Sequence, residues 1–477
     1  MKKLKVVLVV PNFRWVNSDI NALWHYTPYN LCLLAAVIKD ICDVSILDAY
    51  TSNMSEDAFK SELRKLNPDI VGITVLMDQY ASSGHTAAKI AKSINREIIV
   101  VMGGVYATVN PERAVKDNNI DFVVVGEGEY ALRDLIGYVM KKNPLPQKGV
   151  CYSLDGKIVN TGHADFIKDL DDIPLPAYHL INFKNYANSA HRKSVDSPRK
   201  YPYARIMTSR GCPYGCSFCQ VEVISGREFR PRSAKNVLDE IAWLKKEYGI
   251  KSLIFDDDNL FTDRQRAKDI FQGMIDRDIA MPWASIAVAV FKLDEELIKL
   301  MKASGCEYID IAIESGTERV LKKIIKKPVN FEQAKEMARS AKKEGIYVAA
   351  NFIIGFPTET WDEIRQTIKF AEDIDVDYAK IFTAMPLRNT KLWELCEKES
   401  AFKEEFDKSE GMWNVGQIET KEFSSRDLTI LRAYEWDRIN FTNPEKRKKT
   451  AAMMGMTEDE LKETRKRTFN SAFQSIK

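Results

Sequence analysis

Three cysteines lie within eight residues of one another in the segment RGCPYGCSFCQ (210–220). Cys212, Cys216 and Cys219 form a C-x3-C-x2-C pattern directly after an apolar run that predicts a β-strand. Thiolates this close together do not surround one small ion symmetrically, but they suit three corners of a cube-shaped [4Fe–4S] cluster. The pattern therefore predicts a cluster whose fourth iron is free to take another ligand.

A structural zinc site is the alternative for the same loop. Zinc in such a site takes four Cys or His ligands. All five histidines precede the loop, none with zinc-finger spacing from it: His25, His85, His163, His179 and His191. The five other cysteines are scattered, and we expect them to be small buried hydrophobic residues: Cys32, Cys42, Cys151, Cys306 and Cys396. The iron–sulfur cluster is therefore the favoured interpretation.

The loop resembles that of the radical S-adenosylmethionine (SAM) superfamily, whose CxxxCxΦC motif has an aromatic residue before the last cysteine. Phe218 takes that place here. The resemblance implies that the amine and carboxylate of SAM fill the fourth iron, and that Phe218 lies near the adenine. One electron, from a low-potential donor such as flavodoxin or ferredoxin, would then break a C–S bond of SAM and release a 5′-deoxyadenosyl radical.

Two later segments resemble strands that hold SAM in this superfamily. ANFIIGFPTET (350–360) is similar to the adenine-binding fifth strand, with Ile353, Gly355 and Glu359. A glycine at that place would let a base pack close to the backbone.

IDIAIESGTERVLKKIIKK (309–327) is similar to the fourth strand and the helix that follows it. The resemblance places Glu314 at the ribose hydroxyls and Lys326 at the methionyl carboxylate. In LIFDDDNLF (253–261) three aspartates end another strand, and Asp257 is the residue we expect at the methionyl amine or at the substrate.

The segment GGVYATVNPERAVKDNNIDFVVVGEGEYALRDLI (103–136) closely resembles the cobalamin-binding domain found in many radical SAM proteins. Its glycines follow strand ends and permit a close approach of the backbone to a ligand. The expected cobalamin-binding residues lie at three strand ends: Thr74, Leu76, Met77, Gly103, Gly104, Gly126, Glu127 and Gly128.

One departure concerns the cobalt. Relatives that ligate cobalt through histidine have D-x-H-x-x-G after the first strand, whereas the loop here reads PNFRWVNSD (11–19). We therefore expect base-off cobalamin with no histidine ligand, and Leu76 and Met77 covering that face of the cobalt. His25 and His85 are expected to be structural or substrate-side residues.

The elements that must position these residues follow a β–α rhythm. Five apolar runs alternate with helices in the first part of the chain, from KVVLVV (5–10) to FVVVGEGE (122–129). Continuous apolar strands are typical of parallel sheets covered on both faces. We expect an α/β fold that opens with a flavodoxin-like (Rossmann-type) sheet, with its ligands at the carboxyl ends of the strands.

Four segments are expected along the chain. Residues 1–140 would be the cobalamin-binding domain, and the proline-interrupted residues 141–200 a linker with a small hairpin at DGK (155–157). Residues 201–390 repeat a helix–glycine–strand pattern, which predicts a partial (β/α)6 TIM barrel holding the cluster. Residues 391–477 are charged and predicted to form a helical C-terminal cap.

Composition excludes several classes of protein. The 477 residues carry 70 Lys and Arg against 68 Asp and Glu, a formal net charge of +2. This balance gives no general attraction to nucleic acid or to an acidic membrane. The apolar run near the start is too short for a signal sequence, and no later stretch is long and apolar enough to cross a bilayer. We therefore expect a cytoplasmic protein.

Within the cobalamin-dependent branch, the resemblance implies methyl transfer to an unactivated carbon, or sometimes phosphorus, through a 5′-deoxyadenosyl radical and methylcobalamin. The expected substrate is a small molecule or a peptide. The same cofactors also serve cyclisation, ring contraction and rearrangement, which remain the alternative. A non-catalytic cobalamin sensor would not need the cysteine loop, and a methylthiotransferase would need further cluster cysteines upstream.

Overall fold

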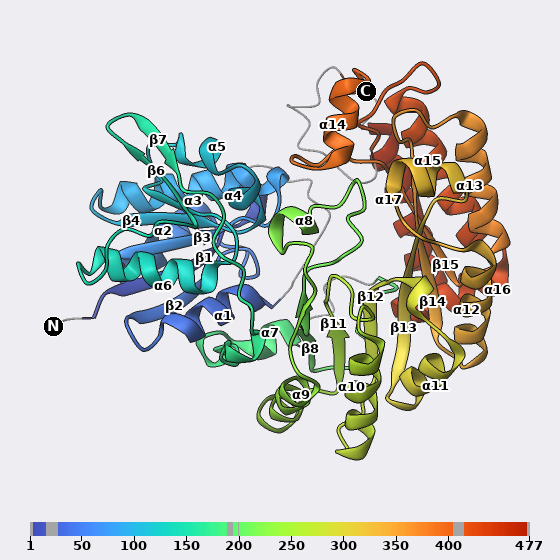
Figure 1. The fold of residues 1–477 in the computed structure, drawn as a ribbon, viewed down its shortest axis with the longest axis horizontal. Helices are drawn as coiled ribbons and strands as arrows, with labels where there is room; N and C mark the ends of the chain where they lie inside the picture. Colours follow the sequence, from blue (N-terminus) through green and yellow to red (C-terminus); the bar gives the residue numbers. More distant parts are fainter. Residues whose placement is uncertain (1–2, 16–26, 188–193, 199, 404–414, 475–477) are drawn as a thin grey trace. The chain divides into compact units, whose positions relative to one another are not determined.

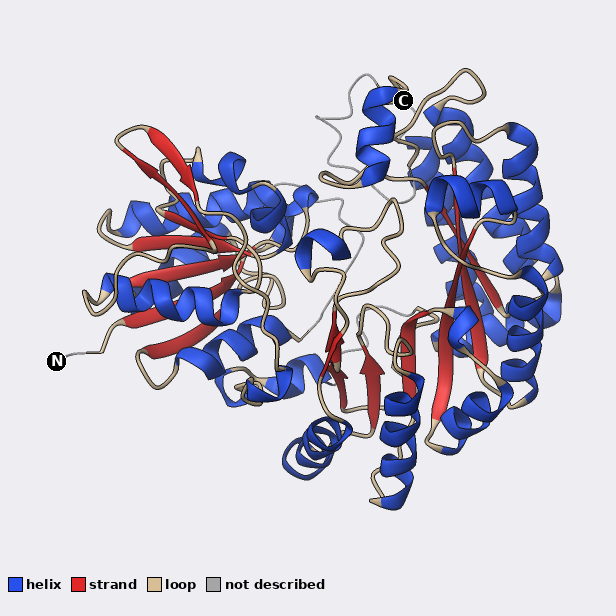
Figure 2. Ribbon diagram, viewed as in Figure 1, coloured by secondary structure: helices blue, strands red, loops and turns tan. Residues whose placement is uncertain are grey.

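A computed structural model of the chain describes residues 3–15, 27–187, 194–198, 200–403 and 415–474. Its internal contacts divide the chain into two units: residues 1–191 with 223–225, and residues 192–222 with 226–477. Each unit combines a largely parallel sheet with helices (Figures 1 and 2). None of the described helices is long and apolar enough to cross a membrane.

The first unit is built on one seven-stranded sheet. In spatial order its strands are β2 (Asp43–Asp48), β1 (Lys5–Val10), β3 (Ile70–Thr74), β4 (Ile99–Gly103), β5 (Phe122–Val124), β6 (Val150–Leu154) and β7 (Lys157–Asn160). The first five strands are parallel, and β6 and β7 add an antiparallel hairpin at one edge. The hairpin predicted at DGK (155–157) therefore forms and extends this sheet.

The helices of the first unit are α1 (Tyr29–Ile38), α2 (Glu56–Leu66), α3 (Ala81–Ile94), α4 (Val105–Val109), α5 (Pro111–Val115), α6 (Gly128–Val139) and α7 (Phe183–Ala187). Short 3-10 turns lie at η1 (Phe13–Trp15), η2 (Asp78–Tyr80), η3 (Leu170–Asp172) and η4 (Tyr178–Leu180). The helix α8 (Val221–Ile224) spans the boundary of the two units.

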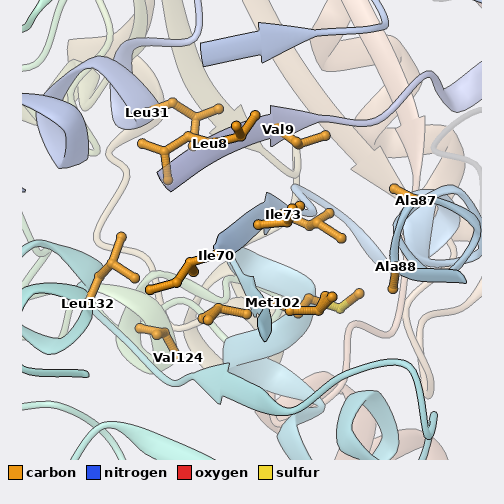
Figure 3. Packing of buried hydrophobic residues seen from close by; sticks show 14 of the residues in the cluster. Leu8, Val9, Leu31, Ile70, Ile73, Ala87, Ala88, Met102, Val124 and Leu132 are labelled. Atoms are coloured by element: carbon orange, nitrogen blue, oxygen red, sulfur yellow. The ribbon is translucent and has the colours of Figure 1, made fainter. Parts of the chain in front are cut away.

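The hydrophobic core of the first unit lies on both faces of its sheet. The side chains of β1 from Val6 to Val9 are at most 1% exposed. Figure 3 shows Leu31 of α1 and Leu132 of α6 on one side of the strands, with Ala87 of α3 on the other. Apolar residues in succession are buried because both faces are covered. The predicted flavodoxin-like order, 2-1-3-4-5, is confirmed.

The second unit has a six-stranded parallel sheet. In spatial order its strands are β15 (Tyr378–Thr383), β14 (Tyr347–Ile354), β13 (Cys306–Glu314), β12 (Trp283–Val288), β11 (Ser252–Phe255) and β8 (Tyr203–Ile206). A separate two-stranded ribbon pairs β9 (Ser209–Arg210) with β10 (Arg230–Pro231). Six strands linked by helices confirm the predicted partial barrel.

The helices of the second unit are α9 (Ala234–Tyr248), α10 (Arg264–Asp276), α11 (Glu295–Ala303), α12 (Phe331–Lys343), α13 (Trp361–Asp373), α14 (Lys391–Lys398), α15 (Ser425–Phe441), α16 (Pro444–Met454) and α17 (Glu458–Gln474). A 3-10 turn η5 (Val290–Lys292) and a π-helical turn η6 (Val320–Ile325) complete the list. Ser233 caps α9 and Gly249 ends it in a left-handed conformation, as the sequence predicts.

The two faces of this sheet differ in polarity. On the face toward the helices, Phe352 of β14 contacts Phe370 of α13. On the opposite face, which we call the inner face, Lys380 of β15 donates to Asp310 of β13 at 2.6 Å. Asn351 of β14 lies in register with Lys380 and shares this face. Alternation along each strand thus gives the half-barrel an apolar exterior and a partly polar interior.

The edge strand β15 is completed by side chains of α15. Because β15 pairs only with β14, one side of its backbone lacks a strand partner. Asn440 accepts from the Ala379 N–H and donates to the Ala379 carbonyl, both at 2.8 Å. Arg432 donates through Nε to the Ile381 carbonyl, also at 2.8 Å. The helix therefore covers an edge that would otherwise be open to pairing with another chain.

Replacing Asn440 tests this edge. Asn440→Ala would leave a buried N–H and a buried carbonyl of Ala379 without partners, so the free energy of unfolding should fall by about 2 kcal/mol. Tyr434→Ala, on the same helix but 56% exposed, should change it by under about 0.5 kcal/mol. Thermal or urea unfolding measures both variants. Equal effects would mean that α15 is not needed to complete the edge.

Candidate active site

The cysteine loop leaves β9 and is held by backbone contacts on three sides. The Cys212 N–H donates to the Gly226 carbonyl at 3.3 Å. The Ser217 N–H donates to the carbonyl of Ile325, at the end of η6, at 3.0 Å, and the Ser217 carbonyl accepts from the Leu392 N–H at 2.8 Å. All three cysteines are half-buried. The loop is thus fixed between residues far away in sequence.

Three consecutive aspartates directly after β11 hold the strand and backbone that lead into the same loop. Asp257 is 5% exposed and accepts from the backbone N–H of Thr208 at 3.0 Å and from the hydroxyl of Ser209 at 2.5 Å. Asp258 accepts from the Gly211 N–H at 3.1 Å. Asp256 forms two hydrogen bonds with Arg205, at 2.7 and 2.9 Å.

These contacts give Asp257 a structural role. Its Oδ1 accepts from the segment that leads into the cysteine loop, so Asp257 supports the loop, whereas its Oδ2 is buried without a hydrogen-bond partner. Its expected contact with the methionyl amine or the substrate stays a prediction. Burial raises the pKa of Asp257 to about 6, and the hydroxyl and N–H donors oppose that rise. Sequence spacing could not separate the three aspartates because each follows the strand directly.

The donor set of the loop fits an iron–sulfur cluster. Burial raises the pKa of the Cys216 thiol to about 11 and that of Cys219 to about 12, and raises the pKa of Cys212 as well. Among the described residues, no three His, Cys, Asp or Glu side chains form a group that could hold one metal ion. Three half-buried thiols in the C-x3-C-x2-C spacing suit the corners of a cluster, and its assembly must displace their protons.

Beside the loop, Glu314 and Lys327 form a buried ion pair. Lys327 Nζ lies 2.7 Å from Glu314 Oε1, and both side chains are under 10% exposed. Burial by itself would lower the pKa of Lys327, but Glu314 and the Cys216 thiol raise it overall. Glu314 ends β13 with a φ of 76°, a costly conformation for a residue other than glycine. Such strain is typical of functional positions.

Lys326, the basic residue expected at this place, is exposed at the end of η6 and has the left-handed φ of 65°. The backbone turn there sends the next side chain inward, and Lys327 is therefore the lysine that meets Glu314. The tandem lysines give no sequence signal for this choice, because it depends on a local break in the helix. Lys327 is therefore a second candidate for the SAM carboxylate, and the contact expected of Lys326 stays a prediction.

The segment that resembles the adenine-binding strand has an additional neighbour. A β-carbon on Gly355 would come within 2.4 Å of Leu428 Cδ1, so the glycine makes room for α15, and its expected contact with adenine stays a prediction. Glu359 accepts from the N–H groups of Gly355 and Phe356 at 2.7 and 2.9 Å, and burial raises its pKa to about 8. Glu359 therefore shapes the turn after β14.

Two other residues of the expected adenine site remain available to a ligand. Ile353 of β14 is half-buried, and so is Phe218 in the cysteine loop. The Phe218 ring lies 6.3 Å from the ring of Phe356, centroid to centroid. Their contact with adenine stays a prediction.

In the first unit, the residues expected to bind cobalamin gather at the carboxyl edge of β3 and β4. The Thr74 hydroxyl accepts from Asn30 at 3.3 Å. Leu76 is 38% exposed, and Met77 is half-buried. A β-carbon on Gly103 would meet nothing closer than 4.0 Å, so packing within the chain does not require a glycine there. A bulky ligand on the strand end would favour a glycine there, so this edge is compatible with a large, partly apolar cofactor.

The neighbouring glycines have partners within the chain. Gly104 has a φ of 94°, and a β-carbon there would lie 2.6 Å from the Val75 carbonyl. Gly126 has a φ of 98° and lies under the ring of His163. Glu127 accepts from the Ile167 N–H at 2.7 Å, while Gly128 begins α6. The carboxylate of Glu127 thus ties a residue that follows the hairpin to the sheet. The contact of Gly104, Gly126, Glu127 and Gly128 with cobalamin stays a prediction.

The histidines agree with the expectation as far as they are described. Both ring nitrogens of His85 have partners, Asp117 at 2.8 Å and the Tyr106 hydroxyl at 3.1 Å, as for a structural residue. His25 and residues 16–19 of the PNFRWVNSD loop lie outside the described residues. The absence of a histidine ligand to cobalt therefore stays a prediction.

Comparison with known proteins bears on both units. Residues 20–136 match the B12 binding domain, and residues 206–371 match the radical SAM superfamily. An uncharacterised methyltransferase of Pyrococcus horikoshii is 35% identical, with 83% of each chain covered. The cytidylyl-2-hydroxyethylphosphonate methyltransferase of Streptomyces wedmorensis is 30% identical, with 82% of this chain and 81% of the relative covered. The chain belongs to the cobalamin-dependent radical SAM methyltransferase family.

Two further relatives have lower sequence identity to this methyltransferase. The anaerobic magnesium-protoporphyrin IX monomethyl ester cyclase of Rubrivivax gelatinosus is 29% identical, covering 80% of this chain and 68% of the cyclase. The solved structure of TsrM, a radical SAM methyltransferase of Kitasatospora setae with cobalamin and a [4Fe–4S] cluster bound, has a TM-score of 0.67 at 20% identity. It covers 84% of this chain and 76% of TsrM, and shows that the fold is shared.

Family membership makes a [4Fe–4S] cluster, SAM and cobalamin the cofactors of this enzyme. We expect the cluster at Cys212, Cys216 and Cys219, SAM beside the Glu314–Lys327 pair, and cobalamin at the carboxyl edge of β3 and β4, and these placements stay predictions. Sequence reasoning missed Lys327, and it missed Asn259, whose side chain hydrogen-bonds the Cys212 thiol.

The cysteine assignment predicts the metal content of variants. Protein reconstituted without oxygen should be brown and hold about four irons per chain. Cys212→Ala, Cys216→Ala and Cys219→Ala should each lose the cluster, because each removes one corner ligand. Cys306→Ala, at a buried position in β13, should keep it. Iron and sulfide analysis decides; tightly bound zinc without iron would contradict the assignment.

The two adjacent lysines make a matched pair for the SAM site. Lys327→Met should weaken SAM binding by about tenfold or more, because it removes a charged partner and leaves Glu314 buried alone. Lys326→Met should leave the affinity unchanged, since that side chain is exposed. Equilibrium binding of SAM to reconstituted protein, with iron content as control, measures both. If only Lys326→Met weakened SAM binding, the role expected of Lys327 would be wrong.

Proposed function

We propose that this enzyme transfers a methyl group from SAM to an unactivated carbon or phosphorus centre of a small molecule or peptide. The proposal is carried by identity of 30% or more, across over four-fifths of both chains, to two proteins named as methyltransferases. One of these acts, by its name, on a phosphonate. The cysteine loop of the second unit and the glycine-containing sheet edge of the first unit, each considered by itself, support the same chemistry.

Each part of the chain has a distinct task in this proposal. When bound, the cluster supplies the electron that cleaves SAM, and cobalamin supplies the methyl group for transfer. Glu314 and Lys327 would bind the polar groups of SAM beside the cysteine loop. Leu76 and Met77 would keep water from bound cobalamin. The inner face of the half-barrel receives the substrate, and a low-potential flavodoxin or ferredoxin delivers electrons.

Cyclisation or rearrangement is the second candidate, favoured by the similarity to the Rubrivivax gelatinosus cyclase. It uses the same cofactors and differs in the fate of carbon. A methylated product is heavier by one CH2 unit, whereas a cyclised or rearranged product has an unchanged carbon count. The Glu314–Lys327 pair serves either reaction, so the product decides between them.

Methyl transfer predicts a definite stoichiometry. One SAM must donate its methyl group in a polar step and leave as S-adenosylhomocysteine. A second must accept one electron at the cluster and, after abstracting a substrate hydrogen, leave as methionine and 5′-deoxyadenosine. With substrate, the two coproducts should therefore form at about one to one with methylated product. Chromatography with mass detection, using SAM labelled in the methyl group, measures all three.

The Cys219→Ala variant separates the two steps. It should still form S-adenosylhomocysteine in a single turnover with reduced cobalamin, because that transfer needs no radical, and it should lose 5′-deoxyadenosine. If the native enzyme formed 5′-deoxyadenosine without S-adenosylhomocysteine, alongside a product of unchanged carbon count, the rearrangement candidate would replace methyl transfer.

A further inference from the structure

Arg432 of α15 is a half-buried arginine without a counter-ion. Its Nε donates to the Ile381 carbonyl at 2.8 Å, while Nη1 is buried and has no hydrogen-bond partner. Within the described residues no carboxylate lies within ion-pair distance of it. Burial without a counter-ion lowers the pKa of Arg432 to about 10, so the side chain still carries its charge at neutral pH.

Other arginines of the same unit form ion pairs with carboxylates. Arg438, six residues further along α15, pairs with Glu372 at 3.0 Å and with Glu435 at 2.7 Å. Arg465 of α17 pairs with Asp437 at 2.6 Å. In the same unit, the buried Arg205 pairs with Asp256 at 2.7 Å. An uncompensated charge is therefore not the general condition of arginines in this part of the protein.

Arg432 belongs to the polar side of the half-barrel. The neighbouring Trp436 donates through its indole N–H to the Tyr378 hydroxyl at 2.8 Å, and the Arg432 guanidinium lies 5.8 Å from the Trp436 ring. Tyr378 lies two residues before Lys380 on β15, so the two side chains share the inner face. Arg432 is therefore positioned beside the interior in which the barrel would hold its substrate.

The charge of Lys380, which lies on the inner face, is compensated by carboxylates, whereas the charge of Arg432 is not. Lys380 lies 2.6 Å from Asp310 and 3.6 Å from Asp196, so two carboxylates compensate its charge. Next to it, Asn351 Oδ1 and Asp310 Oδ1 are buried acceptors without donors. Among the described residues, the inner face thus has buried acceptors without donors, and a cation without a counter-ion lies beside it. This pattern complements a ligand bearing an anion and hydrogen-bond donors.

Keeping a charge away from water without a partner is unfavourable for the folded protein. Positions that cost stability are usually retained because a ligand uses them. A guanidinium with its Nε tied to the backbone presents its remaining N–H groups in a fixed plane, which suits the two or three oxygens of a carboxylate or phosphate.

We propose that Arg432 binds an anionic group of the substrate, a carboxylate, phosphate or phosphonate, at the inner face of the half-barrel. This rests on the proposed function, because it takes the inner face to be the substrate site. The methionyl carboxylate of SAM is a second source of the same chemistry. The experiment therefore measures SAM and free anions separately.

The test uses reconstituted full-length enzyme in chloride buffer, without turnover. Inorganic phosphate, methylphosphonate and acetate are titrated in turn, and binding is followed by thermal shift and calorimetry. Arg432→Gln removes the charge, and Arg438→Gln is the matched control, since it removes the same charge from the same helix. Arg432→Lys keeps the positive charge but loses the planar guanidinium. If Arg432→Gln does not fold, Arg432→Lys is tested in its place.

At least one anion should bind the native enzyme and Arg438→Gln equally, and bind Arg432→Gln about tenfold to a hundredfold more weakly. Arg432→Lys should bind a phosphonate with an intermediate affinity, and SAM affinity should be unchanged in all variants. Equal anion binding by the native and Arg432→Gln proteins, or no binding by the native protein, would overturn the proposal.

A loss of SAM affinity in Arg432→Gln would assign the site to SAM and likewise overturn it. Because no measurement here depends on turnover, failure of methyl transfer would leave the anion result intact. Conversely, if the enzyme transfers methyl groups but Arg432→Gln binds anions as well as the native protein, only this inference is refuted.

Discussion

A loop with almost no regular structure of its own must hold three thiols in fixed positions, and the buried carboxylates after β11 make this possible. Asp257 and Asp258 accept backbone N–H groups from the segment that enters the loop, and Asp256 fixes Arg205 on the adjacent strand β8. Hydrogen bonds to charged acceptors are stronger than neutral ones, and their strength rises where water is excluded. The geometry of the cysteine loop therefore depends on a row of acids that bind the neighbouring backbone and Arg205.

Helix α15 contacts both the edge strand β15 and the turn after β14, the strand that resembles the adenine-binding strand. Asn440 completes the backbone of β15, and Leu428 packs against the bare backbone of Gly355 after β14. The same helix places Arg432 beside the inner face. One helix thus closes the half-barrel, constrains the turn that Glu359 shapes, and supplies a cation where substrate would lie. Helix α15 consequently belongs to the same compact unit as the cysteine loop.

The second unit retains polar groups that a purely structural interior would avoid. Glu314 has a strained backbone, Arg432 lacks a counter-ion, and Asn351 Oδ1 lacks a donor. These features lie on or beside the inner face, whereas the opposite face of the sheet is apolar and closely packed, as at Phe352 and Phe370. The stability supplied by the apolar exterior allows the interior to be specialised for ligands.

The sequence by itself determined what depends on neighbouring residues. Cysteine spacing, apolar runs, the cap at Ser233 and the stop at Gly249 predicted the cluster loop and the order of strands and helices, because each signal acts over a few residues. Only the tertiary structure decided that Lys327 rather than Lys326 meets Glu314, that Asp257 supports the loop, and that Arg432 lies beside β15. Arg432 and its partner Ile381 are 51 residues apart. Such contacts depend on where folding brings distant segments together, and no local pattern encodes that distance.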